Sequence, residues 1–214
     1  MTKIDWVVYG GTFDPPHSGH LLSVEAVCRD LEVSKVYVLP SYAPPIAGAG
    51  VKSPKASFEQ RVEMTKILFS RSPLSSKIEV SDLEADLPKP SYTLSSIEAL
   101  MVSSTGQGAL MIGDDQLEVL HQWYGIGEIL AKVALIVTTR HNDVGDLLEK
   151  FANNMNDETL RDGETLCLRK AKTSLFIQKA VSGAASTLIR EKRGDDAWVD
   201  DDVQSYIEAH DLYK

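Results

Sequence analysis

Residues 4–20, which read IDWVVYGGTFDPPHSGH, decide the fold of this chain. Ile4–Tyr9 is a short run of apolar, β-prone residues, which is typical of a buried strand. Gly10 and Gly11 end the run, and glycine lets a backbone turn sharply and approach a ligand closely. The apolar residues that follow His17 recur with helical spacing. The order of strand, glycine turn and helix therefore predicts the start of a nucleotide-binding α/β domain.

Two histidines, His17 and His20, stand at the predicted start of this helix, three residues apart. Residues at that spacing lie on one face of a helix. The start of a helix also presents unpaired backbone N–H groups and the positive end of the helix dipole. A polyphosphate suits this arrangement, because imidazole groups can donate to charge as it builds on phosphorus. The alternative is that the pair is ordinary polar surface, which agrees less well with its position at a glycine turn.

Length and composition limit the class of protein. A chain of 214 residues, 43% of them hydrophobic, fits one α/β domain with a small helical addition. A net charge of −9 argues against a general nucleic-acid binder. No apolar run approaches the roughly 18 residues of a membrane span, and no export signal is apparent. Cys28 and Cys167 have no metal-type spacing, so we expect free thiols in a reducing cytoplasm.

Strand-like and helix-like runs alternate along the chain, which predicts a parallel, doubly wound sheet wrapped by helices. The expected strands are Ile4–Tyr9, Lys35–Leu39, Lys77–Ser81, Ala109–Ile112, Val133–Thr138 and Leu175–Gln178. The expected helices are Ser18–Leu31, Ser57–Arg71, Leu94–Val102, Asp115–Leu120, Val144–Asn154, Thr187–Arg193 and Asp202–Ala209. Ala43–Lys55 is expected to be a loop, either a lid or a surface excursion. Ligands of such sheets bind beyond the carboxyl ends of the strands, where the segments GGTF and IGDD and Arg140 should converge.

A second phosphate site is predicted at Ser186–Arg190. Serine or threonine is a good helix N-cap, and a helix start binds anions. Arg190 follows one turn later on the same side, where its guanidinium can bind a phosphate through two hydrogen bonds. Many helices begin with a similar string, so the position after a predicted strand is what favours a functional role.

Further candidates are polar and aromatic residues near other predicted strand ends. Asp115 follows a strand and Gly113, a place where an acid accepts hydrogen bonds from ribose hydroxyls, whereas Asp114 is either a site residue or a helix cap. Trp123 is either a stacking partner for a flat charged ring or a core residue. The acidic residues between 195 and 202 are expected to be solvated surface and the start of a helix.

Taken together, these segments resemble the HxGH nucleotidylyltransferases, and most closely the bacterial nicotinate-mononucleotide adenylyltransferases. GGTFDPPHSGH resembles the family signature GGTFDPxHxGH, and Pro40–Pro45 resembles its P-x-x-x-P-P loop. Ser91–Thr93 resembles its SYT motif, and Ile112–Asp115 with the later Trp123 resembles its IGxD motif and tryptophan. Arg140 resembles an arginine that follows the next strand, and Ser186–Arg190 resembles ST-x-I-R.

The resemblance implies a Rossmann-like domain over residues 1–180 and a small C-terminal helical subdomain over residues 181–214. It implies an enzyme of NAD biosynthesis that transfers AMP from ATP to nicotinate mononucleotide and releases pyrophosphate. Such polyphosphate chemistry implies Mg²⁺ held mainly by phosphate and water, with no metal site built by the protein alone. We therefore expect small-molecule substrates and no nucleic-acid or membrane partner, and a homo-oligomer is possible.

The resemblance also assigns roles to individual residues. His17 and His20 are expected to be catalytic. The expected ATP- and phosphate-binding residues are Gly10, Gly11, Thr12, Phe13, Ser186, Thr187 and Arg190. Gly113 and Asp115 are expected to bind ribose. The expected nicotinate-mononucleotide-binding residues are Tyr92, Thr93, Trp123 and Arg140, and backbone N–H groups at Tyr92 and Thr93 would select the nicotinate carboxylate.

Two positions depart from the family pattern. Ile46 and Ala47 replace a histidine and a basic residue after Pro45, although Lys52 or Lys55 offers a substitute, and Ala185 replaces a serine. A lost donor to a charged partner typically costs ~1.5–3 kcal/mol. These departures keep two alternatives open, namely a preference for nicotinamide mononucleotide and a nucleotide-binding regulator without turnover. The sequences of the GGTFDP and IGxD motifs match phosphopantetheine and cytidylyl transferases less well. A class I aminoacyl-tRNA synthetase would need a longer chain with a KMSKS-like loop.

Overall fold

The computed structural model of the protein describes residues 3–45, 53–139, 145–162, 165–171, 173–179, 182, 184–193 and 195–214. Within these ranges the strands are β1 (Lys3–Gly11), β2 (Glu32–Pro40), β3 (Ile78–Val80), β4 (Gly108–Gly113), β5 (Ala134–Thr139), β6 (Thr159–Asp162), β7 (Thr165–Leu168) and β8 (Thr173–Lys179). The α-helices are α1 (Ser18–Asp30), α2 (Phe58–Ser70), α3 (Thr93–Ser103), α4 (Asp114–Leu117), α5 (Ile126–Lys132), α6 (Gly145–Asn154), α7 (Ser186–Arg190) and α8 (Asp201–Ala209).

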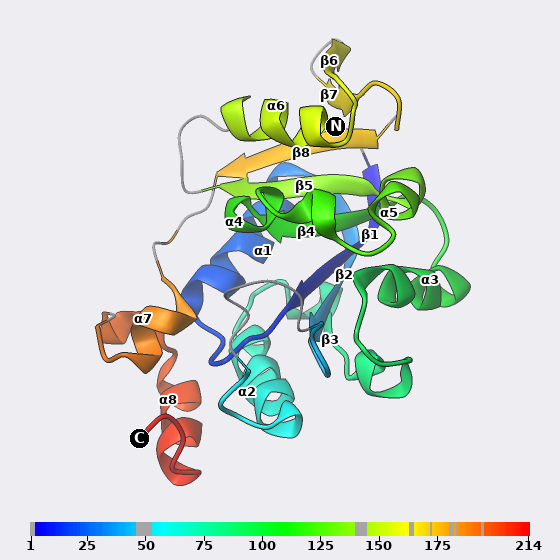
Figure 1. Ribbon diagram of the computed structural model, residues 1–214. Helices are drawn as coiled ribbons and strands as arrows, with labels where there is room; N and C mark the ends of the chain where they lie inside the picture. The colour runs from blue at the N-terminus through cyan, green and yellow to red at the C-terminus, as the bar shows by residue number, and fades with distance from the viewer. Residues whose placement is uncertain are drawn as a thin grey trace.

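The strands form one sheet in the order β3-β2-β1-β4-β5-β8-β7-β6 (Figure 1). Strands β1 to β5 and β8 run parallel to their neighbours in this series. Without the β6–β7 pair, the order is that of a doubly wound dinucleotide-binding fold. From β1 the chain proceeds outward to β2 and β3 and then returns to β4 on the other side of β1. The switch point, where ligands of such folds bind, therefore lies at the carboxyl ends of β1 and β4. The predicted α/β doubly wound fold is confirmed.

Both faces of the sheet are covered, because side chains of each strand alternate between two hydrophobic clusters. In β4, Leu110 and Ile112 join the cluster that is formed with α3, α4, α5 and α6. Ala109 and Met111 of the same strand join the cluster that is formed with α1, α2 and α8. A strand buried on both faces reads as a continuous apolar run, which is why the central strands were predictable from sequence.

The sheet departs from the parallel arrangement at one edge, where two strands were not predicted. β6 and β7 form an antiparallel hairpin, and β7 runs antiparallel to β8. Both strands have four residues and contain polar side chains, so neither gives the long apolar run of a central strand. α5 was also missed, since it has seven residues and follows Gly125, which has a φ of 67°.

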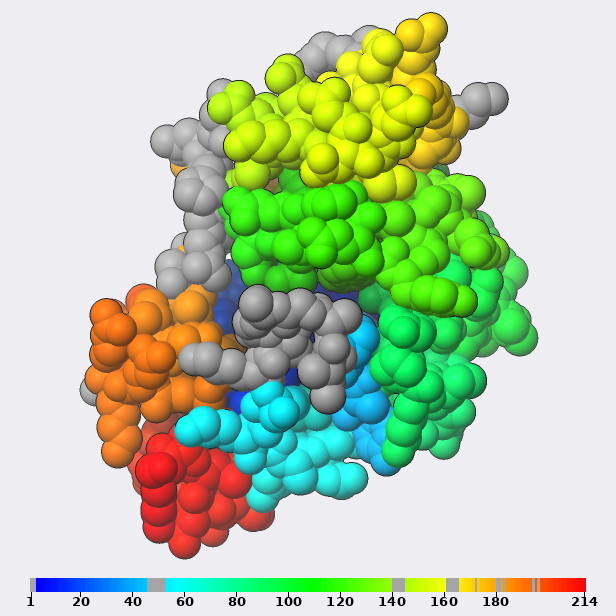
Figure 2. Space-filling model, viewed as in Figure 1, coloured from blue at the N-terminus to red at the C-terminus, as the bar shows by residue number. Residues whose placement is uncertain are grey.

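The last helix, α8, packs beside α2. Val203 and Ile207 of α8 belong to the same cluster as α2, and Arg71 forms ion pairs with Asp200 and Asp202. Figure 2 shows α7 (orange) and α8 (red) lying next to each other, with the segment of α2 (cyan) beside α8. The proposed boundary near residue 180 remains a prediction. Of the expected loop Ala43–Lys55, residues 46–52 lie outside the described ranges.

Candidate active site

The turn that follows β1 is shaped by close contacts of its own residues. A Cβ atom built on Gly11 would lie 3.0 Å from the ring of Phe13, so a side chain there would displace the ring. Phe13 is buried and has a φ of 49°. A Cβ atom built on Gly10 would meet no atom of the described residues within 4 Å. Gly10 therefore borders open space at the carboxyl end of β1, the edge at which ligands of this fold bind.

The two histidines lie side by side where α1 begins. His17 is the N-cap residue, and its backbone N–H donates to Nδ1 of His20 over 3.1 Å. Their imidazole rings stack with centroids 3.7 Å apart, and the ring of Phe13 meets His20 edge-on at 4.9 Å. Because Nδ1 of His20 accepts a hydrogen bond, the proton of the neutral ring resides on Nε2, which makes Nε2 a donor.

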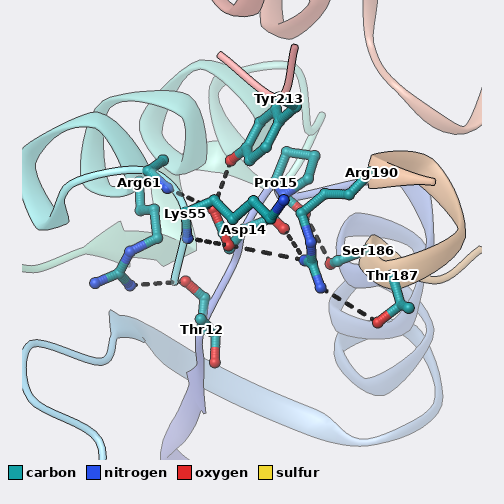
Figure 3. Close-up of polar contacts among 10 residues, drawn as sticks. Thr12, Asp14, Pro15, Lys55, Arg61, Ser186, Thr187, Arg190 and Tyr213 are labelled. Atoms are coloured by element: carbon teal, nitrogen blue, oxygen red, sulfur yellow. Dashed lines mark hydrogen bonds and ion pairs between the residues drawn. The ribbon is translucent and has the colours of Figure 1, made fainter. Parts of the chain in front are cut away.

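Residues of α7 lie against the same turn (Figure 3). Nη1 of Arg190 donates to the carbonyl oxygen of Asp14, and Nη2 donates to Oγ1 of Thr187 over 3.3 Å. The hydroxyl of Ser186 donates to the carbonyl oxygen of Pro15 over 2.9 Å. The segment after β1 and the predicted second phosphate site, far apart in sequence, are therefore in direct contact.

The start of α7 differs from expectation in one respect. Its N-cap is Ala185, which has no hydroxyl, so the expected cap by serine or threonine is wrong. The helix runs over Ser186–Arg190 rather than Thr187–Arg193. Ser186 uses its hydroxyl on Pro15 instead. The side chains of Thr187 and Arg190 contact each other, because Nη2 of Arg190 donates to Oγ1 of Thr187.

Arg61 in α2 was missed by the sequence analysis. Its side chain is 1% exposed, and its Nη atoms donate to the carbonyl oxygens of Thr12 (2.8 Å) and Ser41 (2.7 Å). It therefore ties together the segments that follow β1 and β2. Burial lowers the pKa of this guanidinium, which nevertheless stays charged at neutral pH. The spacing of Arg61 could have indicated its burial, because Arg61 shares a helix face with the buried Met64 and Leu68.

Two acidic residues follow β4. Gly113 is the last residue of that strand, and a Cβ atom built on it would lie 2.4 Å from Oδ1 of Asp115. The carboxylate of Asp115 therefore folds back over the backbone at Gly113. The hydroxyl of Thr139, at the end of β5, donates to Oδ2 of Asp114 over 2.8 Å. Asp114 thus joins the ends of two neighbouring strands, while Asp115 borders the switch point.

An aromatic pair marks the start of α3. Tyr92 is the N-cap of that helix, Thr93 is its first residue, and the ring of Tyr92 stacks on Tyr124 with centroids 4.4 Å apart. Tyr124 is 61% exposed, whereas Trp123 is partly buried against the first hydrophobic cluster. Trp123 was selected from sequence and Tyr124 was overlooked, although the two aromatic residues are adjacent.

A buried carboxylate joins the loop after β2 to the start of α3. Oε2 of Glu84 accepts a hydrogen bond from the backbone N–H of Tyr42 (3.0 Å), and Oε1 accepts one from the hydroxyl of Ser96 (3.2 Å). Ala43 and Ser91 also exchange two hydrogen bonds. Burial raises the pKa of Glu84 although these donors oppose the shift. The segments PSYAPP and SYT are therefore held together.

The predicted site residues fall into groups at one edge of the sheet. Tyr9 in β1 pairs with Met111 in β4, so the glycines two residues further along each strand lie at the same edge. One group consists of the rings of Phe13, His17 and His20. In an adjoining group, Ser186 and Arg190 of α7 contact the backbone that follows β1. Arg140, Ile46, Ala47 and Lys52 lie outside the described ranges. Lys55 contributes its backbone N–H to Asp14 over 2.8 Å.

Two further findings concern metals and membranes. In the part of the chain that the structure describes, no three His, Cys, Asp or Glu side chains gather in a way that could hold a metal ion. None of the described helices combines the length and the apolar character that crossing a bilayer requires.

Comparisons with known proteins add independent findings. The family model described as cytidylyltransferase-like matches residues 8–192. A probable nicotinate-nucleotide adenylyltransferase of Serratia proteamaculans is 30% identical over 222 aligned residues, which cover 100% of this chain and 97% of that protein. One from Sodalis glossinidius is 32% identical and covers 96% and 95%. The structure of the Plasmodium falciparum nicotinic acid mononucleotide adenylyltransferase complexed with NaAD aligns with a TM-score of 0.68 and 19% identity, covering 98% of this chain and 97% of that one. At that identity the structural likeness shows the fold.

Proposed function

Since this chain belongs to the cytidylyltransferase-like family, with relatives at 30% identity among the nicotinate-nucleotide adenylyltransferases, we propose that it transfers AMP from ATP to nicotinate mononucleotide. The products are nicotinate adenine dinucleotide and pyrophosphate, and the reaction is a step of NAD biosynthesis. The observation that carries the proposal is the arrangement beyond β1. There His17 and His20 stack on each other next to Phe13, and Arg190 donates to the backbone carbonyl oxygen of Asp14.

The triphosphate of ATP is assigned to the space beyond Gly10 and Gly11. Backbone N–H groups of Thr12 and Phe13 would donate to the phosphates there, and the space at Gly10 leaves room for a close approach. Ser186, Thr187 and Arg190 complete the phosphate contacts from the opposite side in this proposal. Arginine suits this position because its planar fork of donors matches phosphate oxygens.

The mononucleotide is assigned to the neighbouring edge. Gly113 and Asp115 would bind ribose hydroxyls, because an acid at the end of a strand is suitably placed to accept from them. Tyr92, Thr93 and Trp123 would hold the pyridine ring and its carboxylate, with Arg140 as a further contact. The backbone N–H groups at the start of α3 favour a carboxylate over an amide, so nicotinate is preferred to nicotinamide.

The chemistry asks little of the protein in covalent terms. A phosphate oxygen of the mononucleotide attacks the α-phosphorus of ATP and forms a new P–O bond. The bond between the α-phosphorus and its bridging oxygen breaks, and pyrophosphate departs with the electron pair. Positioning and charge stabilisation drive such transfers. His17 and His20 would donate to phosphate oxygens as negative charge moves towards pyrophosphate.

Magnesium is proposed to accompany ATP. The described residues offer no cluster of metal-binding side chains, so phosphate oxygens and water would supply most of its ligands. When bound, the ion neutralises charge on the triphosphate and on pyrophosphate. The protein residues would still bind and orient the phosphates, and Arg190 would contribute a cation there.

One alternative rests on a specific observation. Ala185 caps α7 without a hydroxyl, so the second phosphate site has one donor fewer than the family pattern. A protein that bound nucleotides but turned them over very slowly would be a regulator. The activity measurement separates that alternative from the proposed enzyme.

The test is pyrophosphate release from ATP and Mg²⁺, with nicotinate and nicotinamide mononucleotides in parallel and the dinucleotide identified by mass. We expect rapid release with nicotinate mononucleotide and its near-complete loss in His20→Ala. His210→Ala is the matched control, because His210 is exposed and stacks on Tyr206 of α8. Preference for nicotinamide mononucleotide would reassign the substrate. ATP binding without any product would favour the regulator, and an active His20→Ala variant would remove the catalytic role of that residue.

A further inference from the structure

The carboxylate of Asp14 is a buried junction beside the proposed phosphate site. Asp14 is 3% exposed. Its Oδ2 accepts from the backbone N–H of Lys55 (2.8 Å), and its Oδ1 accepts from the backbone N–H of Ala56 (3.1 Å) and from the hydroxyl of Tyr213 (2.6 Å). Figure 3 shows Lys55 and Tyr213 reaching Asp14 from separate segments. A carboxylate held by three donors has little freedom to rotate.

Asp14 also holds the cation assigned to the triphosphate. Nη1 of Arg190 donates to the carbonyl oxygen of Asp14 and lies 3.8 Å from its Oδ2. The side chain of Arg190 is 15% exposed, so this ion pair is shielded from bulk water. Nη2 is directed to Oγ1 of Thr187. The direction of the guanidinium therefore depends on Asp14 through both its backbone and its side chain.

Tyr213 belongs to a segment that the family match does not include. The cytidylyltransferase-like model ends at residue 192, whereas Tyr213 follows α8. Its ring and Leu212 pack against the second hydrophobic cluster, and the backbone N–H of Leu212 donates to Ile207 over 3.0 Å. Burial and the hydrogen bond to Asp14 raise the pKa of the Tyr213 phenol. The hydroxyl is thus present as a donor throughout the neutral pH range.

We propose that Tyr213 is a positioning residue for ATP, which acts by fixing the Asp14 carboxylate and thereby the orientation of the Arg190 guanidinium. This inference rests on the proposed function, because it takes Arg190 to be a phosphate contact. Without the hydroxyl, Asp14 loses one of its three donors and becomes free to turn further towards Arg190. The guanidinium then competes less well for phosphate, since its nearest anion binds it more tightly.

The discriminating variant is Tyr213→Phe, which removes one oxygen atom and keeps the packed ring. The matched control is Tyr206→Phe, because Tyr206 is a partly buried tyrosine of α8 whose ring stacks on His210 and whose phenol lies near Glu63. We expect Tyr213→Phe to raise the KM for ATP by about 3- to 10-fold, as loss of one hydrogen bond predicts, with the KM for nicotinate mononucleotide unchanged. Tyr206→Phe should change neither.

A double-mutant cycle with Arg190→Gln shows whether Tyr213 acts through Arg190. The affinity for a non-hydrolysable ATP analogue is measured by calorimetry in the wild type, the two single variants and the double variant. If the proposal holds, Tyr213→Phe weakens binding in the wild-type background and has no further effect beside Arg190→Gln. Equal loss in both backgrounds, or an unchanged affinity in Tyr213→Phe, overturns it. Because this readout needs no turnover, it also decides the matter if the wild type produces no dinucleotide, the result that would refute the proposed function.

Discussion

Nδ1 of His17 lies 3.0 Å from the position that a Cβ atom would take on Gly19. Cε1 of the same ring lies 3.1 Å from that position, so the imidazole rests directly on the glycine. Any side chain at residue 19 would push the ring away from its stacked partner His20. The glycine of the HSGH segment is therefore explained by the volume of its neighbour, since residue 19 lies inside α1 and needs no unusual backbone angle.

We expect Gly19→Ala to lower kcat/KM by at least 10-fold without loss of stability. Alanine favours a helix over glycine by about 1 kcal/mol, which offsets the contact with the displaced ring. Steady-state kinetics and thermal unfolding together check this prediction. Gly127→Ala in α5 is the control, because a Cβ atom there meets nothing within 4 Å. Full activity in Gly19→Ala would mean that the position of His17 is unimportant.

Gly10→Ala should separate ligand binding from stability. A methyl group at Gly10 meets no atom of the described part of the chain within 4 Å, so the free energy of unfolding of the ligand-free protein should stay within about 0.5 kcal/mol of the wild type. The same methyl group would occupy the space assigned to the triphosphate, and we expect ATP affinity to fall by 10-fold or more. The measurement is thermal unfolding with and without ATP. If ATP raises the unfolding midpoint of Gly10→Ala as much as it raises that of the wild type, the phosphates bind elsewhere.

Glu84 should make stability depend on pH in a predictable direction. Burial raises its pKa in the folded protein above the ordinary value of 4.5. Between 4.5 and the raised value the folded state binds more protons than the unfolded state, so Glu84 makes stability fall as pH rises through that window. In Glu84→Gln the amide oxygen can accept from Tyr42 and the amide nitrogen can donate to Ser96, which preserves both contacts.

We therefore expect Glu84→Gln to remove that part of the pH dependence and to be at least as stable as the wild type at pH 7. Urea unfolding at intervals between pH 4.5 and 7.5 tests this directly. A variant that is less stable than the wild type at pH 7 would show that the charged carboxylate contributes more through its hydrogen bonds than its burial costs.

The two adjacent aromatic residues should behave differently. Trp123→Ala removes a side chain that packs on the first hydrophobic cluster, so we expect the free energy of unfolding to fall by about 3 kcal/mol. Tyr124→Ala removes a mostly exposed ring and its stacking on Tyr92, at a cost of about 1 kcal/mol. Both should raise the KM for nicotinate mononucleotide and leave the KM for ATP unchanged. Steady-state kinetics for the two substrates and urea unfolding test these expectations. An increase in KM that is confined to ATP would contradict the assignment of these residues to the mononucleotide.

The central strands and most helices could be predicted from sequence because their signals are local. β1, β4 and β5 are apolar runs buried on both faces, and α2 begins with a serine and a glutamine in a capping box. The β6–β7 hairpin gave no such signal, since its strands are short and covered less completely. Its position at the edge of the sheet follows from pairing with β8, which no local pattern encodes.

The candidate site also has a part that local sequence could predict and a part that it could not. The histidine pair, the glycine turn and the α7 residues are sequence motifs, and their proposed roles remain predictions. What the motifs could not indicate is how they are joined. Arg61 links two loops through backbone carbonyl groups, and Asp14 links segments through backbone N–H groups and a distant tyrosine. Such contacts depend on where the chain has already folded, so they are visible only in three dimensions.

The Asp14 junction has a consequence for how the protein is made. The hydrogen bond to Tyr213 spans 199 residues of sequence, and the bond from Arg190 spans 176. A ribosome has produced β1 to β5 by residue 139, well before it adds Arg190 and Tyr213. Contacts between such distant residues are the slowest to form, because a long loop must close first. During synthesis β1 to β5 can therefore pair early, whereas the contacts of Asp14 with Arg190 and Tyr213 form last.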